Sequence, residues 1–299
     1  MPAIRVRGLR KSYGTIEAVR GVDFDVAEGE VFGFLGPNGA GKTTIVEILE
    51  GYRQRAAGEV TVLGHDPAKG ERALRQRIGI VLQETGVERF LRVVEVLELY
   101  CGYYPRPRRV DELLALVGLE DKRNEVVKEL SGGQRRRLDL ALGLAGDPEL
   151  VFLDEPTTGF DPSARREAWD IVRNLRALGK TIFLTTHYMD EAQHLADRVA
   201  VISAGRIVAE GAPDHLAGRD AATEIRFVPT PAAELPALNG AAVTYDERGV
   251  VIRAADPTAV LHVLTGWALE RGVTLGGLTV TRPTLEDVYL ELTARTPDG

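Results

Sequence analysis

The sequence predicts an α/β fold in which short buried strands alternate with helices. Residues 30–35 form a mostly apolar run that leads into a glycine-rich segment and then into helical spacing over 43–51. Two further apolar runs, 149–153 and 180–185, each lead into polar side chains. Because open α/β sheets bind ligands at the carboxyl ends of their strands, we expect the functional residues at these run ends.

The glycine-rich segment matches the pattern G-x-x-x-x-G-K-[ST], whose backbone N–H groups wrap nucleotide phosphates. Its residues are Gly36, Pro37, Asn38, Gly39, Ala40, Gly41, Lys42, Thr43 and Thr44. Glycines let the backbone close around phosphates, and the helix N-terminus that follows carries unpaired, partly positive amides. Lys42 is predicted to reach the β- and γ-phosphates and Thr43 to bind Mg²⁺. A chance glycine-rich turn is the alternative, and the flanking strand and helix argue against it.

Two carboxylates, Asp154 and Glu155, follow the apolar run 149–153. Successive side chains of a strand point to opposite sides. Asp154 is therefore predicted to bind Mg²⁺, and Glu155 to polarise the attacking water. A strand that ends in solvated acids is the alternative, but the turn segment 156–159 (PTTG) bends the chain at once.

His187 follows the run 180–185, and its imidazole is a candidate contact to the γ-phosphate from the side opposite the loop. A metal site of His187, Glu191 and His194 is the alternative, but further ligands at zinc spacing are missing. Gln83 follows a strand candidate over 77–82 and is a candidate ligand for Mg²⁺ or the attacking water. Taken alone, a glutamine in a loop is usually only solvated.

The signature segment, residues 130–134 (LSGGQ), precedes helical apolar spacing over 134–145. It is a second helix N-terminus with a serine and glycines, which suits phosphate oxygens. We expect the three arginines that follow, Arg135, Arg136 and Arg137, to form a solvated helical face and not to contact phosphate.

In this order, the motifs of residues 1–217 resemble those of the ATP-binding-cassette (ABC) ATPases. Residues 36–44 resemble their Walker A loop, Gln83 their Q-loop, 130–134 their signature and 150–155 their Walker B motif. Asp161 matches the D-loop aspartate, His187 the switch histidine and Tyr13 the aromatic that stacks on adenine. Phe160 departs from the leucine most common there, which we expect to change packing and not chemistry.

The resemblance implies a P-loop NTPase fold with a RecA-like core, an antiparallel β-subdomain and a helical subdomain inserted at about 86–146. It implies ATP hydrolysis with Mg²⁺, and a head-to-tail dimer of two copies. In that dimer, Ser131, Gly132, Gly133 and Gln134 of one copy cover the ATP held by the other copy's loop. The segment 84–92 would contact a membrane partner, so nucleotide state at one end can move a docking surface at the other.

The pattern changes after residue 213, and we expect a cassette over 1–217 and an accessory domain over 218–299. Strands are predicted at 223–228, 241–245, 250–254 and 273–281, and helices at 232–238, 256–271 and 283–294. The order βαββαβ suggests a ferredoxin-like α+β unit without catalytic motifs. Residues 284–290 resemble the C-terminal extension of daunorubicin-resistance exporter ATPases. The same residues also fit an amphipathic helix that caps this domain, which is compatible with that resemblance.

The composition is that of a soluble globular chain, with 44% apolar and 27% charged residues. A net charge of −7, without a basic half, does not suit nucleic-acid binding. No apolar stretch reaches the ~20 residues that cross a bilayer. The resemblance therefore implies a separate, ABC-2-type permease that holds the protein at the cytoplasmic face of the cell membrane. The single cysteine, Cys101, rules out an internal disulfide and is expected to be a buried apolar residue.

The leading function is the ATPase subunit of an exporter for a drug-like or lipophilic substrate. An importer subunit shares every catalytic motif and stays open as an alternative. A DNA-repair or chromosome-organising ATPase would carry CxxC modules or long coiled-coil insertions, and a translation factor would carry two cassettes. A regulator that senses ATP without hydrolysing it is disfavoured by the presence of Glu155 and His187.

Overall fold

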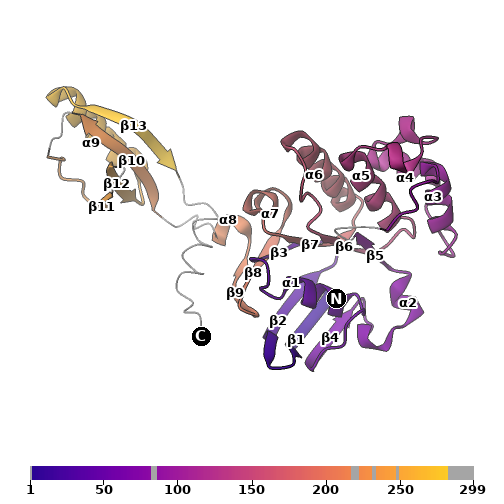
Figure 1. The fold of residues 1–299 in the computed structure, drawn as a ribbon. Coiled ribbons are helices and arrows are strands. Elements are labelled where there is room, and N and C mark those ends of the chain that lie inside the picture. The colour runs from indigo at the N-terminus through magenta and orange to yellow at the C-terminus, as the bar shows by residue number, and fades with distance from the viewer. Residues whose placement is uncertain (1, 82–85, 217–221, 231–233, 247–248, 282–299) are drawn as a thin grey trace. The chain divides into compact units, whose positions relative to one another are not determined.

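The computed structural model describes residues 2–81, 86–216, 222–230, 234–246 and 249–281 (Figure 1). The chain divides into two compact units, residues 1–212 and 213–299. This division lies five residues before the boundary that we expected at 217/218. None of the helices in the described ranges is long and apolar enough to cross a bilayer.

A six-stranded sheet forms the centre of the first unit (Figure 1). Neighbouring strands are parallel from β5 to β8, and β9 is antiparallel to β8. The central strands are buried on both faces, which explains their continuous apolar runs. The predicted strands at 30–35, 77–82, 149–153 and 180–185 are present within two residues of the expected ends. In spatial order the strands are β5 (Ile78–Val81), β6 (Leu150–Asp154), β7 (Thr181–Thr186), β3 (Val31–Leu35), β8 (Arg198–Ser203) and β9 (Arg206–Gly211).

An antiparallel sheet packs beside this core, as predicted. Its strands are β1 (Pro2–Tyr13), β2 (Ile16–Ala27) and β4 (Ala57–Val62), with β1 in the middle. Phe183 of β7 joins the two sheets, because its ring centroid lies 6.1 Å from that of Phe24 in β2 and 5.8 Å from that of Phe32 in β3. Helix α1 (Lys42–Leu49) adds Ile45 and Ile48 to the same core.

Helices form the segment between β5 and β6 and enclose a second apolar core. The helix predicted at 110–117 has those bounds, and the one predicted at 93–104 ends earlier, at Cys101. Cys101 is buried, as expected. The helices are α3 (Val93–Cys101), α4 (Val110–Val117) and α5 (Gly132–Gly143). Short 3₁₀ helices at Glu120–Lys122 and Val127–Glu129 also lie in this segment. Elsewhere in the unit lie α2 (Arg72–Arg75), α6 (Pro162–Ala177), α7 (Met189–Leu195) and a 3₁₀ helix at Pro67–Lys69.

The second unit opens with α8 (Pro213–Leu216), followed by a four-stranded antiparallel sheet that packs against α9 (Pro257–Arg271). The strand order is β11-β12-β10-β13, so β12 lies between the first two strands of the unit, as in a split β-α-β arrangement. The strands are β10 (Thr223–Thr230), β11 (Ala241–Asp246), β12 (Gly249–Ala254) and β13 (Thr274–Thr281).

The helix predicted at 232–238 is wrong for the residues described there. Residues 234–240 are not helical, whereas 232–233 lie outside the described residues. Pro236 removes a helix donor and disfavours helical geometry at the preceding residue. Leu235 and Leu238 nevertheless pack against the core of this unit. The helix predicted at 283–294 and the resemblance at 284–290 lie outside the described residues.

Candidate nucleotide site

The glycine-rich loop, residues 36–44, joins β3 to α1 and passes close to other backbone. A Cβ on Gly36 would lie 2.5 Å from the carbonyl oxygen of Ile202. Gly41 has a φ of 106°, and a Cβ there would lie 2.6 Å from the carbonyl oxygen of Ala18. Only glycine fits these two positions, so the pattern has a local structural cause.

Lys42, the first residue of α1, is 5% exposed and points along the loop. Its Nζ donates to the carbonyl oxygens of Gly36 at 2.7 Å and Pro37 at 3.2 Å. The same Nζ lies 3.8 Å from Oε1 of Glu155. Burial lowers the pKa of Lys42, while the carboxylates of Glu155 and Asp154 act in the opposite direction. The loop thus holds a cation within reach of a carboxylate from another strand.

The end of β6 carries Asp154 and Glu155 and is fixed by Thr185 of β7. The Thr185 hydroxyl donates to Oδ1 of Asp154. The backbone N–H of Glu155 donates to the Thr185 carbonyl at 3.1 Å and to its hydroxyl at 3.2 Å. Glu155 has a φ of 46°, a left-handed backbone conformation that residues other than glycine rarely adopt. Its N–H is held in that conformation by the neighbouring strand.

The Glu155 carboxylate is the point at which three separate motifs meet. His187, just after β7, places Nδ1 3.3 Å from Oε1 of Glu155, and Lys42 approaches the same oxygen. The Thr158 hydroxyl donates to Oε2 at 3.2 Å. The His187 ring packs on Tyr188 with centroids 4.1 Å apart. The structure therefore brings together the predicted base, switch histidine and loop lysine.

Tyr13 lies at the N-terminal end of α1. Its hydroxyl is 3.3 Å from the Thr44 hydroxyl, and its side chain is 40% exposed. The Arg53 guanidinium lies 5.1 Å from the ring centroid, and the Lys11 ammonium lies 5.5 Å from it. An aromatic face beside the loop suits a nucleotide base. Gln83 lies outside the described residues.

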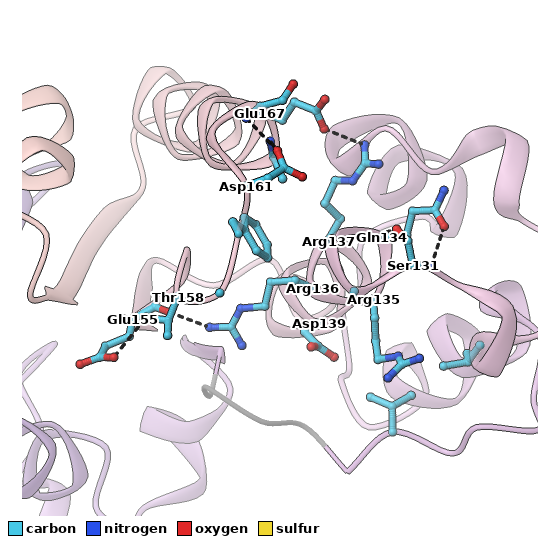
Figure 2. A pocket seen from close by; sticks show the side chains of 18 of the residues that line it. Ser131, Gln134, Arg135, Arg136, Arg137, Asp139, Glu155, Thr158, Asp161 and Glu167 are labelled. Atoms are coloured by element: carbon cyan, nitrogen blue, oxygen red, sulfur yellow. Dashed lines mark hydrogen bonds and ion pairs between the residues drawn. The ribbon is translucent and has the colours of Figure 1, made fainter.

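The signature segment begins α5 with a reciprocal cap. The Gln134 N–H donates to the Ser131 hydroxyl at 3.2 Å, and the Ser131 N–H donates to Oε1 of Gln134 at 2.9 Å. Helix α5 therefore begins at Gly132, two residues earlier than predicted. This helix end lines an open groove of about 840 Å³ that also includes Asp161 and Glu155 (Figure 2).

Asp161 is the N-cap of α6, where one carboxylate oxygen accepts from the N–H groups of Ser163 at 2.8 Å and Ala164 at 2.9 Å. The signature and this aspartate thus lie on one groove. Two residues of the alternative metal site, Glu191 and His194, contact other protein groups. Glu191 is buried and accepts from Thr157 and Trp169, and His194 stacks on Trp169.

The expectation that Arg135, Arg136 and Arg137 form a solvated face is wrong. All three are partly buried, and each donates to a backbone carbonyl. The acceptor is Leu130, just before the helix, for Arg135, Asp154 for Arg136 and Gly118 for Arg137. Arg136 reaches the end of β6, where burial lowers its pKa against the effect of the nearby acids Asp139 and Asp154. The reason is that α5 packs against β5, and Arg136 reaches from it to the end of the neighbouring strand β6, so that protein partly covers these side chains.

Magnesium fits the residues at the end of β6. The carboxylate of Asp154 and the exposed hydroxyl of Thr43 are oxygen donors of the kind that Mg²⁺ takes beside nucleotide phosphates. In the described ranges, no group of three or more His, Cys, Asp or Glu residues forms a metal site by itself. A cation shared between two protein oxygens and phosphate is consistent with both observations.

Thr185 and Arg136 are the contacts that the sequence analysis missed. Thr185 is the next-to-last residue of the buried strand β7, beside the strand that carries Asp154, so a polar residue at that place was a usable signal. Arg136 had none, because the direction of its side chain is set by packing.

These features define a class, an α/β nucleotide-triphosphate-binding protein with a phosphate loop and an acidic strand end. A family model described as ABC transporter matches residues 19–158, and one for the C-terminal domain of ABC transporter domain-containing-like proteins matches 223–284. The chain belongs to the ABC transporter ATP-binding proteins, which bind and hydrolyse ATP.

Relatives match nearly the whole chain. The daunorubicin resistance ATP-binding protein DrrA3 of Streptomyces coeruleorubidus is 41% identical, over 97% of this chain and 96% of that protein. The Nod factor export ATP-binding protein I of Rhizobium meliloti (strain 1021) is 40% identical, over 98% of this chain and 88% of that protein.

Solved structures match part of the chain. The cbiO1 subunit of Clostridium perfringens, part of the ABC transporter complex cbiONQ, is 28% identical with a TM-score of 0.68. The match covers 73% of this chain and 92% of that one. A dimeric ATP-binding cassette in a post-hydrolysis state, bound to ADP and Pi, is 25% identical with a TM-score of 0.63. That match covers 70% of this chain and 98% of the solved one.

Proposed function

We propose that this protein is the ATP-hydrolysing subunit of an exporter for drug-like or lipophilic substrates. ATP hydrolysis is supported by one observation: Lys42 and His187 both approach Oε1 of the Glu155 carboxylate. Support for export comes from the relatives, which are named for daunorubicin resistance and for Nod factor export. Both align along almost the entire chain, including the accessory unit.

In the proposed mechanism, the loop amides and Lys42 bind the β- and γ-phosphates of ATP. Thr43 and Asp154 would hold Mg²⁺, to which Gln83 is the further ligand suggested by the family resemblance. When bound, Mg²⁺ would neutralise negative charge on the phosphates. Glu155 accepts a hydrogen bond from the attacking water and orients it, and His187 contacts the γ-phosphate. Tyr13 stacks on the adenine.

Each nucleotide is shared between two copies in this proposal. The loop of one copy holds ATP, and Ser131, Gly132, Gly133 and Gln134 of the other copy cover the γ-phosphate. Asp161 lies on the same groove as Ser131 and takes part in that contact. The solved dimeric cassette that resembles this chain supports the arrangement. A separate ABC-2-type permease holds the dimer at the cytoplasmic face of the membrane.

Reconstitution with a permease tests the export function. The protein is co-expressed with a candidate six-span permease chosen from the neighbouring reading frames and placed in inverted vesicles with a fluorescent lipophilic drug. ATP-dependent accumulation of the drug, lost in Glu155→Gln, is the expected result. ATP hydrolysis without drug movement, but with uptake of a hydrophilic solute in right-side-out vesicles, would contradict export and favour an importer.

A further inference from the structure

Arg136 connects the signature helix to the strand end that carries Glu155. It lies five positions after Ser131 on α5, and its side chain points toward Glu155 in Figure 2. Its Nε donates to the carbonyl oxygen of Pro156 at 3.2 Å. Its Nη2 donates to the carbonyl oxygens of Asp154 at 3.1 Å and Glu155 at 3.4 Å. One guanidinium thus holds three consecutive carbonyls.

These contacts act on a backbone conformation that needs support. Glu155 has a φ of 46°, and such a conformation persists at a residue other than glycine only when its surroundings fix it. The N–H of Glu155 donates to the Thr185 carbonyl, and the carbonyl of Glu155 accepts from Arg136. The two contacts together set the direction in which the carboxylate leaves the chain.

The neighbouring arginines make different contacts. Arg135 donates to the carbonyl oxygen of Leu130 at 3.5 Å, at the start of its own helix. Arg137 donates to the carbonyl oxygen of Gly118 at 3.2 Å and pairs with Glu167. The contact with the acidic strand end therefore belongs to the middle position of the three.

We propose that Arg136 is a positioning residue that fixes the backbone of Glu155 and ties it to Ser131 through α5. This proposal rests on the proposed function, in which Ser131 covers the ATP held by the other copy. Glu155, in contrast, acts on the ATP held by its own loop. The carboxylate that acts on one ATP is therefore fixed by a side chain of the helix whose N-terminus covers the other ATP.

Steady-state kinetics of Arg136→Gln test the positioning role. We expect kcat to fall between about tenfold and a hundredfold, because a displacement of ~1 Å at a reacting group has effects of that size. KM should stay within about threefold, since the loop and Tyr13 are untouched. Arg136→Lys should lose less activity, because an ammonium still reaches one carbonyl. Arg173→Gln, which removes the same charge from an exposed pair on α6, is the control.

The outcomes separate the two proposals. If Arg136→Gln folds and has the wild-type kcat, this inference is overturned and the proposed function stands. A change in KM alone has the same meaning. If Arg136→Gln does not fold, the lysine variant decides, and an unchanged kcat there has the same meaning. A wild-type dimer that does not hydrolyse ATP would overturn the proposed function itself.

Discussion

Glu50 gives a pH-dependent stability that can be worked out from the structure. It lies at the C-terminal end of α1, is 6% exposed, and its Oε1 is buried without a hydrogen-bond partner among the described residues. Burial raises its pKa to about 8, and the charges of Asp154 and Glu47 add to the rise. The carboxyl group is therefore neutral in the folded protein at pH values where it is ionised in the unfolded chain.

The sign and size follow from proton linkage. Since the folded state binds the proton more tightly, the contribution of Glu50 to stability is complete below pH 4.5, its ordinary pKa. That contribution is lost as the pH rises toward about 8. Within that window the free energy of unfolding should fall by about 1.4 kcal/mol per pH unit from this group. From about pH 6 to about pH 7.5 the loss is roughly 2 kcal/mol.

Urea titrations without nucleotide or Mg²⁺, followed by circular dichroism, measure this slope. Glu50→Gln should lose it, so the variant gains stability over the wild type as the pH rises. Glu59→Gln removes a carboxylate from an exposed position on β4 and should keep the wild-type slope. If the wild type and Glu50→Gln give parallel curves across this range, Glu50 is ionised in the folded protein and the reasoning is refuted.

Three substitutions in the candidate site have clear expected results. Glu155→Gln should bind ATP but slow hydrolysis by at least about a hundredfold, giving an ATP-stable dimer in gel filtration; a normal rate would remove Glu155 from its role. Lys42→Ala should lose most nucleotide affinity in a fluorescent-ATP titration, and an unchanged affinity would contradict its phosphate contact. Gly36→Ala would place a Cβ 2.5 Å from the carbonyl oxygen of Ile202 and should lower both the melting temperature and ATP affinity. A wild-type melting curve would show that the loop tolerates the shift.

Much of the fold could be predicted because buried parallel strands are continuous apolar runs. The strands β3, β6 and β7 are examples, and the helical spacing of apolar residues likewise predicted α4. The position of β3 between β7 and β8 could not be predicted, because neighbours in a parallel sheet are joined by long crossovers. A helix was predicted at 232–238 because the segment is rich in Ala and Leu, but residues 234–238 are not helical. Pro236 should have counted against that prediction.

The candidate site was predictable where a side chain's role depends on its own strand or helix end. Lys42, Glu155 and His187 are of this kind, and they lie together as their motifs imply. Arg136 was not predictable. Its contacts reach carbonyls 18 to 20 positions further along the chain, and only the packing of α5 against β5, the neighbour of β6, brings them within hydrogen-bond distance.

A nucleotide shared between two copies is the central element of the proposed mechanism. A crystal structure with Mg²⁺ and a slowly hydrolysed ATP analogue tests this directly. We predict two nucleotides per dimer, each with its phosphates on Lys42 of one copy and its γ-phosphate covered by Ser131 of the other. A structure in which each nucleotide is enclosed by a single polypeptide, with Ser131 away from any phosphate, would contradict it.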